Sequence, residues 1–208
     1  MNKWMIDKQF SFCYGHRVWV QKLEQEFCAK GDTKTKCRHL HGHEGLVHVF
    51  LESSELNKQG MVTDFKHLGW LKDFLDNNVD HKFILDLNDP YFSSIINAEP
   101  IFDVEGQKPL LGLAQKSKLN YQAVLISAIP VLIPGTNHLT GYALDTKDME
   151  GPEKEFYEGF FLVNFVPTSE NLCKWLFECA QAKMSLINVQ VSRIDWFETP
   201  KSRSSYFA

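Results

Sequence analysis

Residues 37–43 read Cys-Arg-His-Leu-His-Gly-His, and an apolar, strand-like stretch over residues 44–52 follows at once. On an extended backbone, side chains two residues apart point to the same face. His41 and His43 can therefore direct two imidazoles at one point, and Gly42 leaves room for close approach. Imidazole is a preferred zinc ligand, and catalytic zinc usually has three protein ligands and one open position. The stretch therefore predicts part of a zinc site that needs a third ligand.

His16 is the best candidate for that third ligand, because it ends the Phe- and Tyr-rich segment that predicts a first strand over residues 5–14. A neighbouring strand can set it against His41 and His43. A lone histidine is more often a surface or core residue than a ligand, but a His-Gly-His pair beside a strand that ends in histidine favours metal binding. We assign the following histidines to the core or surface: His39, His48, His67 and His138.

The composition is that of an ordinary soluble globular protein. The chain has 208 residues, of which 44% are hydrophobic and 23% charged, and it fits one domain over residues 1–208. A formal charge of −4 gives no indication of duplex nucleic acid or an anionic membrane as partner. Residues 1–8 have no signal-peptide core, and no apolar run approaches a membrane span. Five irregularly spaced cysteines argue against a disulfide framework, so we predict a cytoplasmic protein.

Periodicity predicts a chain of strands and helices with a long central insertion. In order, the predicted elements are strands over residues 5–14 and 44–52, a helix from Thr63 or Asp64 to about residue 78, an insertion over about residues 89–160, a helix after Pro167, and a strand over residues 187–197. The apolar positions of the first helix are Phe65, Leu68, Leu71, Phe74 and Leu75. Thr168 is placed to cap the second helix, and Glu170 lies in its first turn. The insertion has no sustained helical period and is expected to contain short strands of its own.

Two further carboxylates stand where they could take part in chemistry. Asp80 precedes His81 and could fix its tautomer, which would make His81 a general acid or base near neutral pH. Adjacent strand residues point apart, so this pairing needs a turn. Glu198, at the end of the last predicted strand, could accept two N–H donors from a guanidine-like ring edge. Taken singly, each motif is more often a solvated surface feature.

Together and in this order, these pieces resemble the 6-pyruvoyl-tetrahydropterin synthase and 6-carboxytetrahydropterin synthase family. The matching segments are residues 12–17 (Phe-Cys-Tyr-Gly-His-Arg), 37–43, 60–65 (Gly-Met-Val-Thr-Asp-Phe), 80–81, 167–172 (Pro-Thr-Ser-Glu-Asn-Leu) and 198–199, with Tyr206 nearby. The resemblance implies an α+β tunnelling fold, in which a four-stranded antiparallel sheet carries two helices on one face. It also implies that subunits join edge to edge into a homo-oligomer, a hexamer or another trimer-based assembly, with active sites at subunit interfaces.

The resemblance also implies roles for particular residues. They fall into three groups: zinc ligands His16, His41 and His43; catalytic groups Cys37, Asp80 and His81; and pterin contacts Glu198 and Thr168. The nearest candidates for contacting a triphosphate are Lys36, Arg38 and Arg17.

The implied reaction is the zinc-dependent conversion of 7,8-dihydroneopterin triphosphate to 6-carboxy-5,6,7,8-tetrahydropterin. Acetaldehyde and triphosphate are released, and the product feeds 7-deazaguanine and queuosine biosynthesis. The alternatives are the pyruvoyl-forming synthase, which eliminates triphosphate, a pterin side-chain aldolase-like relative, and a non-catalytic pterin-binding oligomeric module. Two departures from the family pattern bear on substrate choice: the long insertion, and the bulkier residues Cys13-Tyr14-Gly15 before His16.

Overall fold

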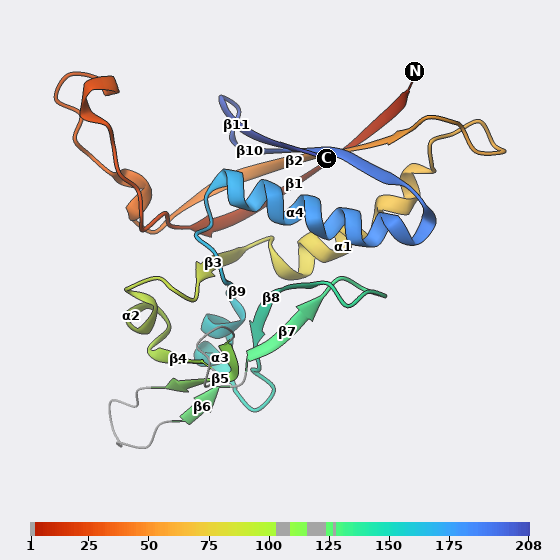
Figure 1. Ribbon diagram of the computed structural model, residues 1–208. Coiled ribbons are helices and arrows are strands. Elements are labelled where there is room, and N and C mark those ends of the chain that lie inside the picture. The colour runs from red at the N-terminus through yellow and green to blue at the C-terminus, as the bar shows by residue number, and fades with distance from the viewer. Residues whose placement is uncertain (1–2, 103–108, 116–123, 127) are drawn as a thin grey trace.

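The computed structural model describes residues 3–102, 109–115, 124–126 and 128–208 (Figure 1). Its larger sheet has eight strands among these residues. In sheet order they are β11 (Ser202–Phe207), β10 (Gln190–Thr199), β2 (His41–Ser53), β1 (Trp4–His16), β3 (Lys82–Asp86), β9 (Phe160–Val163), β8 (Leu139–Leu144) and β7 (Ala128–Leu132). A second sheet contains β4 (Ala98–Phe102), β5 (Pro109–Gln115) and β6 (Val124–Ile126).

The long strands β1 and β2 form the antiparallel pair on which the histidines lie. Their register runs from Trp4 opposite Ser53 to His16 opposite His41. β10 pairs with the other edge of β2, and β11 turns back along β10. Alternation predicts that one set of β2 side chains points inward, and these side chains, Val47, Val49 and Leu51, are fully buried. Trp196 on β10 is fully buried as well. These three predicted strands are confirmed, but β10 begins at Gln190 and not at residue 187, because Ser185–Ile187 form a 3₁₀ helix. β11, rich in Ser, has no apolar alternation that would have revealed it.

Two helices, α1 (Gly69–Asn78) and α4 (Ser169–Met184), lie on the same side of these strands (Figure 1). The Thr168 hydroxyl caps α4 by accepting a hydrogen bond from Asn171 N at 3.2 Å, as predicted. The first helix begins later than predicted, because a 3₁₀ helix, η3 (Phe65–Leu68), precedes it. Phe65 is 50% exposed and does not join the apolar stripe to which the periodicity assigned it.

The predicted sheet of four antiparallel strands is wrong as a description of the whole sheet, although the α+β class is confirmed. Four antiparallel strands, β11-β10-β2-β1, form one part of a mixed sheet of eight. The sheet continues because β3 pairs in parallel with the end of β1, placing Tyr14 opposite Lys82 and Gly15 opposite Phe83. β9 then pairs in parallel with β3. Strands of five and four residues are too short for their apolar runs to be recognised as strands.

The predicted insertion adds a second hydrophobic core. It contains β4 to β8 and two helices that the sequence pattern does not predict, α2 (Phe92–Ile96) and α3 (Gly151–Glu158); parts of it lie outside the described residues. Successive residues of β3 alternate between two clusters: Ile84 joins the core beneath α1 and α4, whereas Leu85 packs with α2 and α3 residues. The two cores therefore lie on opposite faces of the sheet.

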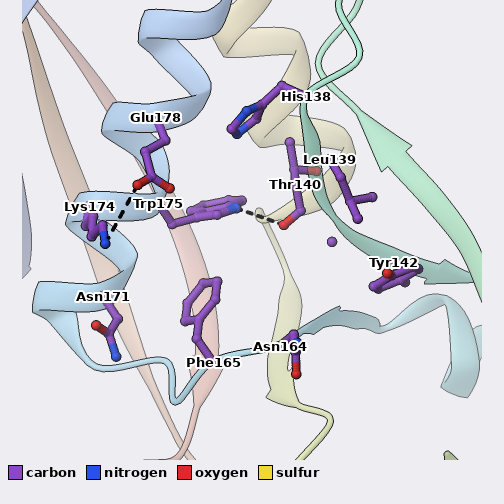
Figure 2. A pocket seen from close by; sticks show the side chains of 11 residues that line it. His138, Leu139, Thr140, Tyr142, Asn164, Phe165, Asn171, Lys174, Trp175 and Glu178 are labelled. Carbon is purple, nitrogen blue, oxygen red and sulfur yellow. Dashed lines mark hydrogen bonds and ion pairs between the residues drawn. The ribbon is translucent and has the colours of Figure 1, made fainter. Parts of the chain in front are cut away.

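The insertion also contacts α4 directly. Trp175 Nε1 donates a hydrogen bond to Thr140 O on β8 at 2.8 Å (Figure 2). A cavity of about 450 Å³ lies at this contact, with Phe165 and the Lys174–Glu178 ion pair on its walls (Figure 2). It contains none of the predicted site residues. None of the described helices combines the length and apolar content that crossing a membrane requires.

Candidate metal and substrate site

Three imidazoles meet where β1 ends and β2 begins. The antiparallel register sets His16 opposite His41 and Tyr14 opposite His43, so these side chains share one face of the sheet. We call His16, His41 and His43 the three-histidine cluster. One ring nitrogen from each lies within 4.8 Å of the others, and the ring centroids are 4.5 to 5.0 Å apart. The geometric prediction from the sequence, two imidazoles from one strand and one from its neighbour, is therefore what the fold produces.

The second nitrogens of two rings are held by backbone carbonyls. His16 Nδ1 lies 2.6 Å from Pro167 O, and His41 Nδ1 lies 2.8 Å from His39 O. A carbonyl only accepts hydrogen bonds, so each Nδ1 carries the proton and each Nε2 keeps its lone pair. Histidines that bind metals are usually oriented in this way. Sequence reasoning missed Pro167 as part of the site, because a backbone carbonyl leaves no mark in a residue pattern.

The donor set fits a divalent metal such as zinc. Tetrahedral zinc with Zn–N bonds of about 2.0–2.1 Å places two ligand nitrogens about 3.3 Å apart. The Nε2 atoms of His16 and His43 lie 3.1 Å apart. Two lone pairs at this separation repel each other unless a proton or a cation lies between them. The cluster therefore has the chemistry and the spacing of a metal site.

Burial favours the neutral form, which metals bind, at His16 and His43. Desolvation lowers the pKa of His16 to about 4, with the Pro167 carbonyl opposing and the other two histidines adding to the shift. Desolvation also lowers the pKa of His43, followed by the effect of His41. Near neutral pH, protons therefore compete only weakly with a metal for these nitrogens.

Glu198 lies beside the cluster at the end of β10. Its Oε1 is 3.7 Å from His16 Nε2, and its side chain is 23% exposed. Burial raises the pKa of Glu198, the Glu170 carboxylate raises it further, and His41 partly opposes this. A half-buried carboxylate of this kind gains most from a ligand that donates N–H groups to it. Thr168, next to Pro167, uses its oxygen as the helix cap, while its O–H remains a separate donor.

Cys37 lies on the short helix η2 (Lys36–Arg38) and is half-buried. Its backbone is tied to the segment that leaves β1: Cys37 O accepts from Val18 N at 2.6 Å, and Cys37 N donates to Gln21 Oε1 at 3.0 Å. Its sulfur is not part of the group of possible metal-binding atoms found among the described residues. The structure thus places Cys37 beside the segment that leaves β1, outside the three-histidine cluster.

Asp80 and His81 form the turn that their pairing requires. His81 has a left-handed φ of 57°, and its Nδ1 lies 3.0 Å from Asp80 Oδ2. Asp80 Oδ1 accepts from Cys13 N at 2.7 Å, and His81 N donates to Cys13 O at 2.7 Å. The Cys13 N–H has the largest effect and lowers the pKa of Asp80, desolvation opposes it, and His81 lowers the pKa further. The pair is therefore an oriented carboxylate–imidazole dyad fixed to β1.

The dyad does not reach Cys37 within one chain. Among the described residues, no hydrogen bond or ion pair joins His81 to Cys37. The His81 side chain is 80% exposed. It borders an open hollow of about 610 Å³, which Cys13 and Glu44 also line. Cys13 on β1 and Glu44 on β2 are each one residue along from the pair Tyr14 and His43, so their side chains point to the opposite face of the sheet from the histidines. His41 and His43 also border this hollow.

Comparison with known proteins decides the family. The family model described as 6-pyruvoyl tetrahydropterin synthase matches residues 5–208. This chain belongs to the 6-pyruvoyl tetrahydropterin synthase family. Among curated proteins, the 6-carboxy-5,6,7,8-tetrahydropterin synthase of Aquifex aeolicus is 39% identical over 112 residues, which cover 50% of this chain and 69% of that one. The enzyme of the same name from Rickettsia conorii is 31% identical over 86 residues, covering 39% of this chain and 51% of that one.

Solved structures match the fold of this chain over nearly its whole length. An uncharacterised protein of Wolinella succinogenes is 37% identical and superposes with a TM-score of 0.75, covering 100% of this chain and 99% of its own. The 6-pyruvoyl tetrahydropterin synthase of Plasmodium falciparum is 14% identical with a TM-score of 0.52, covering 99% and 98%, and shows a shared fold alone. The chain's named relatives are thus pterin synthases, which are enzymes.

Proposed function

We propose that this chain is a zinc-dependent 6-carboxytetrahydropterin synthase. It would convert 7,8-dihydroneopterin triphosphate and water to 6-carboxy-5,6,7,8-tetrahydropterin, acetaldehyde and triphosphate, on the route to 7-deazaguanines and queuosine. The observation that carries the proposal is the three-histidine cluster, in a chain whose curated relatives bear the carboxy-forming name.

His16, His41 and His43 would hold Zn²⁺ through their Nε2 atoms. The chemistry that a bound Zn²⁺ supplies is Lewis acidity toward the side-chain hydroxyls of the substrate, which acidifies the neighbouring C–H and O–H bonds. Glu198, at the edge of the cluster, would accept the two N–H donors of the guanidine-like edge of the pterin. These hydrogen bonds would favour its charged form and offset the cost of its burial.

Proton transfer falls to Cys37 and to the Asp80–His81 dyad. The Cys37 thiol would move a proton at the substrate side chain, and His81 the matching one. Asp80 holds His81 by Nδ1, which leaves Nε2 as the working atom. Because His81 is exposed and has no contact with Cys37 in its own chain, we propose that the dyad of one copy completes the site of another. A homo-oligomer with sites at subunit interfaces follows from this.

Product analysis tests the proposal most directly. Zinc-loaded protein is incubated with 7,8-dihydroneopterin triphosphate, and the products are identified by mass spectrometry with a separate assay for acetaldehyde. We expect 6-carboxytetrahydropterin and acetaldehyde in equal amounts, and a Cys37→Ala variant that loses turnover but keeps its zinc. A pyruvoyl product without acetaldehyde would indicate the alternative synthase. Full zinc occupancy with no turnover would leave a pterin-binding module.

A further inference from the structure

The segment that follows β1 contacts the start of the predicted insertion directly after His16. Arg17 Nε lies 3.0 Å from Asp89 Oδ2, and the Asp89 side chain is fully buried. The N–H is not aligned for a hydrogen bond, so the contact is an ion pair. The Arg17 guanidinium also lies 5.1 Å from the centroid of the Tyr91 ring. Separating such a pair would leave a buried charge uncompensated, and this holds the two segments together.

Trp19 makes a second contact with the same region. Its Nε1 donates to Asp86 Oδ2 at 2.9 Å, and Asp86, the last residue of β3, is 1% exposed. Asp86 Oδ1 accepts from the backbone N and from Nδ2 of Asn88, at 2.9 and 3.0 Å. Asn88 Nδ2 in turn donates to Asn164 Oδ1 at 2.9 Å, just after β9. The acceptor of the Trp19 hydrogen bond is therefore fixed by residues that lie just outside the two ends of the insertion.

Between these two contacts lies Val18, which holds Cys37. Val18 N donates to Cys37 O, and Gln21 Oε1 accepts from Cys37 N, so both backbone groups of Cys37 bind this one segment. The helix η2 that carries Cys37 has three residues and no side-chain cap, and it cannot hold the thiol in place by itself. The position of Cys37 therefore depends on where residues 17–21 are held.

We propose that Asp86 and Asp89 are positioning residues for Cys37. We call their contacts with Trp19 and Arg17 the exit clamp. Neither carboxylate touches the substrate; the clamp fixes the path of the chain after His16, and Val18 passes that position to Cys37. The catalytic meaning of the clamp rests on the proposed function, whereas its effect on the place of Cys37 does not.

The test compares two conservative clamp variants, Trp19→Phe and Asp89→Asn, with the control Asp195→Asn. Asp195 is buried like Asp89, at 1% and 4% exposure, and it is paired with arginines, but it lies on β10. The readout is the rate of iodoacetamide labelling at Cys37 divided by that at the exposed Cys13, resolved by peptide mass spectrometry. For Trp19→Phe, the usual net worth of one hydrogen bond predicts that the ratio rises roughly threefold to tenfold. Asp89→Asn removes the charge that faces Arg17 and should raise the ratio as well. The control should leave it unchanged.

Kinetics and rescue separate positioning from general loss of structure. The clamp variants should keep the zinc content of the wild type and lose kcat while KM for dihydroneopterin triphosphate changes little, since only the placement of a proton-transfer group is disturbed. Arg17→Lys keeps a cation beside Asp89, whereas Arg17→Ala removes it. The labelling ratio of Arg17→Lys should therefore be nearer to the wild-type ratio than that of Arg17→Ala.

Unchanged labelling ratios in folded Trp19→Phe and Asp89→Asn protein would overturn the exit clamp, and so would an equal rise in Asp195→Asn. If Asp89→Asn does not fold, Trp19→Phe alone decides, because it removes one hydrogen bond and keeps the aromatic ring. If the ratio rises only in the clamp variants while wild-type protein turns over no pterin, the proposed function fails and the clamp stands.

Discussion

His39 and His41 differ in what an alanine substitution removes. The His41 imidazole belongs to the three-histidine cluster, whereas His39 contributes only its backbone carbonyl, which alanine keeps. We therefore expect His41→Ala to lose most of about one zinc per chain, because catalytic zinc takes three protein ligands. His39→Ala should stay fully loaded. Metal analysis after dialysis measures both, and equal zinc contents would contradict the assignment of ligands.

The cysteines differ in burial, because Cys173 and Cys179 are buried whereas Cys13 is exposed. Burial raises the pKa of Cys173 to about 12 and also raises that of Cys179. At pH 8, a thiol with this pKa is about one part in ten thousand thiolate, and the thiolate is the reactive form. Iodoacetamide should therefore label the exposed Cys13 and spare Cys173 and Cys179 until urea unfolds the chain. Labelling of the buried pair in folded protein would contradict the packing of α4.

At the scale of elements, the approach of β3 to β1 can be tested through a glycine. A Cβ at Gly15 would lie 2.5 Å from Cδ2 of Phe83, so the ring must move. Overpacking usually costs about 1–3 kcal/mol, which is the loss of stability we expect for Gly15→Ala. Gly69 is helical and nothing lies within 4 Å of a Cβ added there, so Gly69→Ala should stabilise by about 0.5–1 kcal/mol. Urea unfolding measures both, and a shift of the same sign in the two variants would contradict this packing.

The elements that could be predicted are those with a long apolar pattern. β1, β2, α4 and β10 each repeat their buried positions over at least ten residues, which makes the period visible. The contact of His16 with His41 and His43 could be predicted because these residues lie at the adjoining ends of β1 and β2. What could not be predicted depends on short or backbone features: the parallel pairing of β3, the carbonyl of Pro167, and the ties that hold Cys37 outside the cluster. The roles of Cys37, Glu198 and the dyad remain predictions.

At the scale of the whole molecule, the separation of His81 from Cys37 predicts that inactive variants can rescue each other. Cys37→Ala and His81→Ala are each expected to be inactive alone. If each site takes its thiol from one copy and its dyad from another, random mixing of the two variants restores an intact pair at about one quarter of the sites. Activity after co-refolding, compared with each variant alone, measures this. No recovery in a mixed oligomer of confirmed composition would indicate sites built within single chains.

Pro167 and Thr168 are neighbours, yet one steadies a ring of the cluster and the other starts α4. We therefore expect occupancy of the cluster by an ion and the integrity of this sixteen-residue helix to be coupled through a single peptide bond. Any ion that binds only the native chain adds to its stability by mass action. Removal of the ion by a chelator should therefore lower the stability of α4, and fraying of α4 should in turn lower the affinity of the cluster for the ion.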